Sequence, residues 1–114
     1  MRTIIAGSRT IIDHNILSNV VSKCGWHITT VLTGLAHGVD FLGVMWAIDN
    51  GIKLEKYPAN WKEYGISAGY KRNLQMAIKA EALIAIWDGK SRGTRHMIEL
   101  AGEYLLKIHV EVII

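Results

Sequence analysis

Short apolar runs alternate along this chain with segments whose apolar residues recur every three or four positions. The short runs are rich in β-branched or consecutive apolar residues, which is typical of strands. They occupy residues 2–6, 28–33, 53–57, 83–87 and 108–114. The segments between them predict helices. These run from Asp13 to Gly25, from Phe41 to Asn50, over 71–80 and over 97–106.

Strands that alternate with helices predict an α/β fold with a parallel sheet covered on both faces. Right-handed crossovers make this a three-layer, Rossmann-like, doubly wound sheet of about five strands. By analogy with such folds we expect the strand order 3-2-1-4-5. The length of 114 residues suits one domain over residues 1–114. Residues 59–70 are polar, aromatic and glycine-containing, and we expect a long functional loop there.

Composition narrows the class of protein. Half of the residues are hydrophobic and 20% are charged, an ordinary globular balance. No segment resembles a secretory leader or a membrane span, so we expect a cytoplasmic protein without a membrane partner. The single cysteine, Cys24, excludes an internal disulfide, and the scattered histidines lack the spacing of a metal site. The net charge of +3 permits an anionic ligand without requiring nucleic acid.

Three glycine-rich turns follow the first, second and fourth predicted strands. The carboxyl ends of parallel strands meet at one edge of the sheet, where ligands of such folds bind. Glycines let backbone N–H groups approach an anion, and hydroxyls and helix N-termini add donors. One such turn could be plain turn geometry, but three together favour a phosphate site. The candidate residues in these turns are Gly7, Ser8, Arg9, Thr33, Gly34, Gly38, Asp40, Asp88, Gly89, Ser91, Gly93 and Thr94.

Basic residues surround these turns, which suits an anionic ligand or, alternatively, DNA phosphates. No Gly-x-Gly-x-x-Gly or Walker lysine motif is present, so a standard dehydrogenase or P-loop NTPase is disfavoured. Lysine or arginine at a helix start opposes the helix dipole, which also hints at an anionic partner. The basic residues concerned are Arg9, Lys71, Arg72, Lys90, Arg92 and Arg95.

Four motifs in order make the chain resemble the YspA-like, YpsA-related branch of the SLOG superfamily, relatives of DprA and of LOG-type phosphoribohydrolases. They are Ala6–Arg9, Thr33–Asp40, Ala68–Gly69 with Arg72–Asn73, and Trp87–Thr94. The resemblance implies a Rossmann-like domain that binds a nucleotide derivative related to ADP-ribose, NAD or a signalling nucleotide. It also implies a pocket in which Arg72 and Asn73 reach in from the middle helix. Around them, the resemblance places Gly34, Gly38 and Asp40 in one wall, Ser91, Gly93 and Thr94 on a phosphate, and Ser8 and Arg9 at the first turn.

Two positions depart from the family pattern. Leu35 stands where the family commonly has a second glycine, which makes this turn resemble the DprA version and narrows access to the backbone. Met97 stands where LOG enzymes carry a catalytic glutamate. Glu99 lies two residues further along the predicted helix and should face elsewhere. The LOG-type hydrolase hypothesis therefore lacks its carboxylate.

Several candidates keep two interpretations. Asp40 is either the N-cap of a helix or a ligand-binding or catalytic group. Asp88 either binds a ribose hydroxyl or shapes its turn. Trp61 and Tyr64 either stack on a base or attach the loop to the body of the protein. His37 is either an acid–base group or a solvated loop residue.

Three functions follow from these alternatives. The first is a sensor or sequestering protein for a nucleotide-type small molecule, which would suit a phage or mobile element and needs no cofactor besides the nucleotide. The second is a nucleotide hydrolase in which Asp40 or Asp88 supplies the catalytic carboxylate. The third is a DNA-binding protein by analogy with DprA. The apolar last strand, 108–114, also predicts a homo-oligomer.

Overall fold

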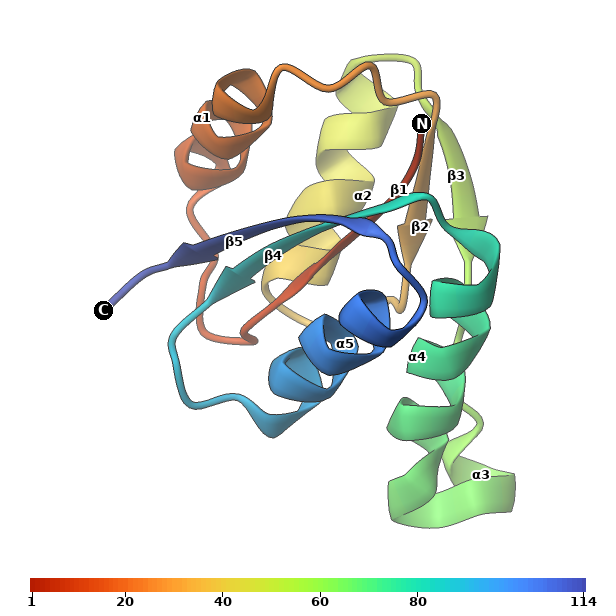
Figure 1. The fold of residues 1–114 in the computed structure, drawn as a ribbon. Helices are drawn as coiled ribbons and strands as arrows, with labels where there is room; N and C mark the ends of the chain where they lie inside the picture. Colours follow the sequence, from red (N-terminus) through yellow and green to blue (C-terminus); the bar gives the residue numbers. More distant parts are fainter.

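The computed structural model covers residues 1–114 and shows one five-stranded parallel sheet in the order β3-β2-β1-β4-β5 (Figure 1). The predicted fold class and strand order are confirmed. The strands are β1 (Arg2–Gly7), β2 (Thr30–Thr33), β3 (Lys53–Lys56), β4 (Ala82–Trp87) and β5 (Lys107–Val112). The helices are α1 (His14–Cys24), α2 (Val39–Asp49), α3 (Trp61–Tyr64), the 3₁₀ turn η1 (Gly65–Ser67), α4 (Ala68–Lys79) and α5 (Arg92–Glu103).

Helices cover both faces of the sheet, with α1 and α2 on one side and α4 and α5 on the other (Figure 1). Side chains alternate between the two faces along each strand. Ile5 therefore packs with the α1–α2 core, while its neighbour Ile4 packs with the α4–α5 core. The central strands β1 and β4 are buried on both faces, which explains their continuous apolar sequence.

The ends of α1 follow the signals in the sequence. The Asp13 carboxylate accepts the Asn15 N–H at 2.9 Å and caps the first turn. Gly25 closes the helix in the left-handed conformation, with φ of 65°. None of the helices is both long enough and apolar enough to span a lipid bilayer.

The predicted loop at 59–70 is wrong, because this segment is largely helical. Asn60 accepts the Glu63 N–H at 3.1 Å and donates to the Glu63 carboxylate at 2.9 Å, which starts α3. The chain continues through η1 directly into α4, which begins at Ala68 rather than at 71. Polar residues and glycine are common both in loops and at the ends of short helices, so their presence did not distinguish the two.

The bounds of three further elements differ from the prediction. The helix α5 begins at Arg92 rather than 97, because Ser91 caps it, so Gly93 and Thr94 lie in its first turn. Strand β2 begins at Thr30 rather than 28, and β5 spans Lys107–Val112. The earlier start of α5 brings its positive N-terminal end to the edge where β1 and β4 finish.

Candidate functional site

A cleft opens over the carboxyl ends of β1 and β2, between α4 and the first turns of α2 and α5. Strand β1 lies at the switch point, because β2 and β3 extend the sheet on one side of it, and the chain then crosses to add β4 and β5 on the other. We call the part between β1, α4 and α5, of about 260 Å³, the inner lobe. Its floor is apolar and its sides are polar. It is lined by Ala6, Gly7, Met76 and Met97 below and by Arg9, Ala36, Asp40, Arg72, Asn73, Ser91, Gly93 and Thr94 around it.

Two further hollows adjoin the inner lobe. The turn lobe, of about 480 Å³, lies against the β2–α2 turn and reaches Leu35 and His37. The aromatic lobe, of about 160 Å³, lies against α4 and reaches Tyr70. Arg9 and Arg72 line all three lobes, so the lobes meet around these two guanidinium groups.

Arg72 is held in place by its neighbours. Its Nη1 donates to the Gly34 carbonyl at 2.5 Å, and its Nε donates to Asn73 Oδ1 at 3.0 Å. A Cβ atom on Gly34 would lie 2.3 Å from Nη1, so only glycine leaves room for this contact. Burial lowers the pKa of Arg72, and the nearby Asp40 carboxylate opposes that shift. The cleft therefore contains a positioned positive charge.

Asn73 connects this arginine to α5. Because Arg72 Nε can only donate, Asn73 Oδ1 must face it, and the amide nitrogen faces the other way. That nitrogen donates to the Gly93 carbonyl at 3.2 Å and lies 3.2 Å from His96 Nδ1. His96 Nδ1 is then the acceptor, and burial lowers the pKa of this imidazole. The Tyr70 ring packs edge-on against His96 at 4.6 Å. This network sets the spacing of α4 and α5 at the cleft.

Asp40 lies in the wall of the inner lobe and is 5% exposed. It is not an N-cap, because Gly38 occupies that position of α2. Its Oδ2 accepts the Ala36 N–H at 3.3 Å. Burial raises the pKa of Asp40, while the Ala36 amide and the charge of Arg72 pull it down. The carboxyl group thus supports the β2–α2 turn and also borders the cleft.

Asp88 shapes the β4–α5 turn. Its Oδ1 accepts the N–H groups of Lys90 at 2.8 Å and Ser91 at 2.9 Å, and these bonds lower its pKa. Its own N–H donates to the buried Ser8 hydroxyl at 2.9 Å. The Asp88 side chain lines none of the three lobes. The geometry favours the turn interpretation over contact with a ribose.

The candidate residues separate into two groups. Nine line the cleft, and five lie outside it, in the turns. Gly38 belongs to the second group, since a Cβ there would lie 2.3 Å from the Ser8 carbonyl oxygen. The cleft-lining group is Gly7, Arg9, Gly34, Asp40, Arg72, Asn73, Ser91, Gly93 and Thr94. The turn-holding group is Ser8, Thr33, Gly38, Asp88 and Gly89.

The first turn of α5 presents hydrogen-bond donors to the cleft. Ser91 Oγ accepts the Thr94 N–H at 3.4 Å and the Thr94 hydroxyl at 3.0 Å. The N–H groups of Arg92 and Gly93 have no partner within the helix, as at any helix start. Gly93 borders both the inner and the aromatic lobes, and no atom lies within 4 Å of where its Cβ would be. An anion could approach this backbone closely.

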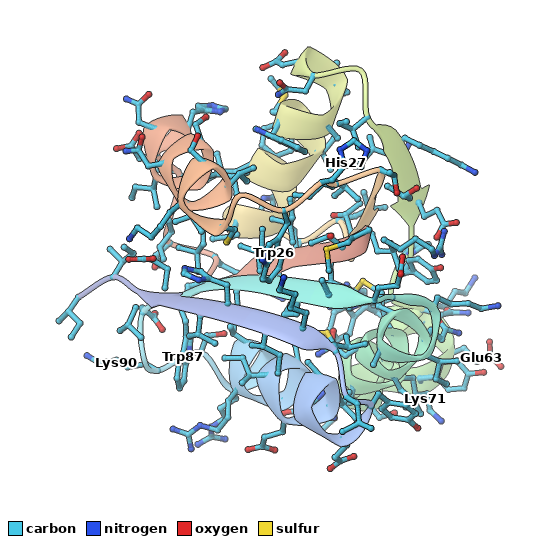
Figure 2. All side chains as sticks on the ribbon, turned by 45° about the horizontal axis from the view of Figure 1, so that its top comes forward. Trp26, His27, Glu63, Lys71, Trp87 and Lys90 are labelled. Carbon is cyan, nitrogen blue, oxygen red and sulfur yellow. The ribbon has the colours of Figure 1, made fainter.

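Most of the basic residues do not reach the cleft. Lys71 Nζ lies 4.7 Å from the centre of the Tyr64 ring, and Arg95 lies 5.7 Å from the Trp87 ring. Lys71 and Lys90 lie on opposite sides of the molecule in Figure 2. The expected basic cluster around the turns therefore reduces to Arg9 and Arg72, and the other cations do not form one face.

Some residues of the cleft carry no functional signal in the sequence. Met76 and Met97 are 1% exposed, as core residues should be, yet they also form the floor of the inner lobe. Trp61 separates the turn lobe from the aromatic lobe, whereas Tyr64 lines neither. Glu99 is exposed and lies outside the lobes, as expected from its helical position. No periodic pattern could show that a buried methionine also touches a cleft.

The model of the YspA, cpYpsA-related SLOG family matches residues 1–64, more than half of the chain. The chain belongs to this family. SLOG domains are nucleotide-related and Rossmann-like, in agreement with the sheet described above. The match contains the first two glycine-rich turns and Asp40, while α4 and α5 lie beyond it. No curated protein and no solved structure matches the chain.

Proposed function

We propose that this SLOG-family protein binds a nucleotide-derived ligand in the cleft and keeps it unchanged, as a sensor or a sequestering protein. ADP-ribose, NAD and signalling nucleotides are the ligand classes concerned. The observation that carries the proposal is the meeting of the three lobes around Arg9 and Arg72, beside the first turn of α5. Guanidinium groups and helix-start N–H groups are the donors that phosphates prefer in proteins.

The two arginines have different parts in this proposal. Arg72 is already bound to the Gly34 carbonyl and to Asn73, so its charge is positioned before a ligand arrives. Arg9 is exposed and has no hydrogen-bond partner within the chain, so its donors are available to a phosphate. A positioned charge beside a free one favours an anion that spans adjoining lobes.

The remaining surface of the cleft suits the rest of a nucleotide. Trp61 is 52% exposed where the turn and aromatic lobes meet, and it offers a flat face to a base. Gly69 packs beneath the ring, and a Cβ there would lie 3.3 Å from the tip of the indole, a tight contact. Together the adjoining lobes fall in the size range of sites for small ligands.

The positions of the carboxylates support retention rather than turnover. Met97 occupies the position of the LOG glutamate, and Asp88 is engaged by two backbone N–H groups outside the cleft. One observation favours the alternative of N-glycosidic or phosphate hydrolysis: Asp40 lines the inner lobe, and burial raises its pKa, as in a general acid. If hydrolysis occurs, Asp40→Asn should abolish turnover and preserve binding.

The test is incubation with ADP-ribose, NAD, nucleoside monophosphates and cyclic nucleotides. Native mass spectrometry reads what the protein retains, and chromatography reads what remains in solution. We expect at least one compound to be retained and recovered intact. Conversion to a base and a ribose phosphate would replace this proposal with the hydrolase, and failure of every compound to bind would overturn both.

A pair of arginine variants tests the location. Arg9→Gln removes a charge that lines all three lobes, whereas Arg92→Gln removes another exposed charge that lines none. A charge-assisted bond is worth about 1.5–3 kcal/mol, so Arg9→Gln should raise the Kd for the retained compound about 10- to 100-fold. Arg92→Gln should change it less than about threefold, by long-range charge alone. Equal effects would place the ligand elsewhere.

A further inference from the structure

The two edges of the sheet differ in how they are protected. Strand β3 has four residues, with exposed lysines at both ends, and Glu55 within it is paired with Arg2. Short, charged edges of this kind resist pairing with another chain. Strand β5 has six residues and no proline, and one row of its side chains is apolar and at least 36% exposed. This edge lacks the usual protection.

The outward backbone groups of β5 belong to the same residues as that apolar row. The N–H groups of Lys107 and Ile113 donate toward β4, to Glu81 and Trp87. Along a parallel strand, alternate residues direct their N–H and C=O groups to opposite sides. Even-numbered residues of β5 therefore present their backbone groups to the open edge. These residues are Ile108, Val110 and Val112.

The same three side chains point to the α4–α5 face of the sheet. In the register of β4 and β5, Ile108 lies beside Leu83 and Val110 lies beside Ala85, which belong to the core on that face. Strand β5 lies at the border of the sheet in Figure 1, and no helix runs along its outer side. Exposed backbone donors and an exposed apolar row thus coincide along one strand.

We propose that β5 pairs antiparallel with β5 of a second copy of this chain, about a two-fold axis through Val110. Val110 then faces Val110 of the partner, and Ile108 faces Val112 of the partner. In each of these pairs both residues direct their backbone groups to the other strand, so each exchanges two hydrogen bonds. The sheet continues from one copy into the other.

The polar side chains of β5 favour this register over the registers shifted along the strand. Centred on Val110, the pairing sets His109 opposite Glu111 of the partner, and the reverse. On the opposite, α1–α2 face, Lys23 and His109 already lie 3.2 and 3.0 Å from Glu111, so the partner extends an existing row of polar contacts. A two-fold axis at Glu111 would set two carboxylates against each other, which destabilises a strand pair. An axis at His109 would set His109 against itself and leave Val112 without a partner within the strand.

The interface is separate from the candidate site, because no residue of β5 lines the cleft. A test of this interface is therefore independent of a test of the proposed nucleotide binding. The measurement is sedimentation equilibrium of the full chain over a wide range of concentration. We expect a dimer for the wild type. A monomer up to the highest soluble concentration would overturn the proposal.

Two variants at the two-fold position test the register. Val110→Lys and Val110→Glu each set like charges against each other, and each should raise the dimer Kd at least about tenfold. An equimolar mixture of the two variants should dimerise again, because lysine then faces glutamate. This rescue is expected only if residue 110 faces its own copy. Undiminished dimerisation of either variant, or a mixture of folded variants that stays monomeric, would refute the register.

A control and a second measurement keep the test independent of folding. Ile48→Lys adds the same charge at a 63% exposed position of α2, a helix that packs on β1, β2 and β3, and should dimerise like the wild type. Circular dichroism checks that each variant folds. In the wild type, amide exchange at Ile108, Val110 and Val112 should slow as protein concentration rises, because pairing protects these N–H groups. Exchange that is independent of concentration there would contradict the pairing.

Discussion

Leu35, in the β2–α2 turn of the cleft, has a left-handed backbone with φ of 62°. Such a conformation costs an L-residue with a side chain about 1–2 kcal/mol. Glycine avoids that cost but loses about 0.5–1 kcal/mol more in backbone entropy on folding than alanine does. Because Leu35 is 45% exposed, Leu35→Gly and Leu35→Ala lose similar packing, and their difference isolates the backbone. We expect the glycine variant to be the more stable of the two, by about 0.5–1 kcal/mol.

Urea unfolding at equilibrium, followed by circular dichroism, measures the free energy of unfolding of both variants. The matched control is Gln75, an exposed position inside α4. At that position glycine should be less stable than alanine by about 1 kcal/mol, so the sign of the difference reverses between the two sites. If Leu35→Gly is no more stable than Leu35→Ala, the left-handed turn does not carry the strain assigned to it.

Three further outcomes follow from the site. Gly34→Ala would place a methyl group 2.3 Å from Arg72 Nη1, so it should displace the guanidinium and weaken binding of the retained nucleotide about tenfold by calorimetry. Burial raises the pKa of Asp40 above its value of about 4 in the unfolded chain, so the free energy of unfolding of the wild type should fall as pH rises through this interval. The Asp40→Asn variant should lack this fall. If urea unfolding gives the two proteins the same dependence on pH, the prediction is wrong. Met97→Ala should lower the free energy of unfolding by about 2–5 kcal/mol, since the side chain is 1% exposed; a loss below about 1 kcal/mol would show that the cleft floor collapses around the gap.

Local signals predicted the elements that depend on neighbours in sequence. The continuous apolar run of β4 and the Asp13 and Gly25 signals of α1 led to the observed strand and helix, because burial and capping act within a few residues. The same reasoning failed at 59–70. There Asn60 and Gly65 belong to caps of a short helix, and caps and loops use the same residue types.

Long-range contacts decided the roles within the candidate site. Asp40 and Asp88 both follow strands, and the sequence offered both as candidate catalytic carboxylates. In the structure Asp40 lies in the cleft wall, whereas Asp88 accepts hydrogen bonds from its own turn. The choice depends on which backbone N–H groups each carboxylate meets. Arg72 likewise acquires its position from the carbonyl of Gly34, 38 residues away, which no local pattern reveals.

The sequence by itself determined the order of strands and helices and the positions of the three glycine-rich turns. Because strands and helices alternate, the sheet had to be parallel, and the three turns had to lie at the same edge of it. Periodicity and turn chemistry are local properties, so they can be read along the chain. Tertiary structure alone decided that only Arg9 and Arg72 among the nearby cations reach the cleft. It also decided that the residues of β5 whose backbone groups face the sheet edge are the same residues that form its exposed apolar row. Both depend on distances between segments far apart in sequence, which are set by how the helices pack on the sheet.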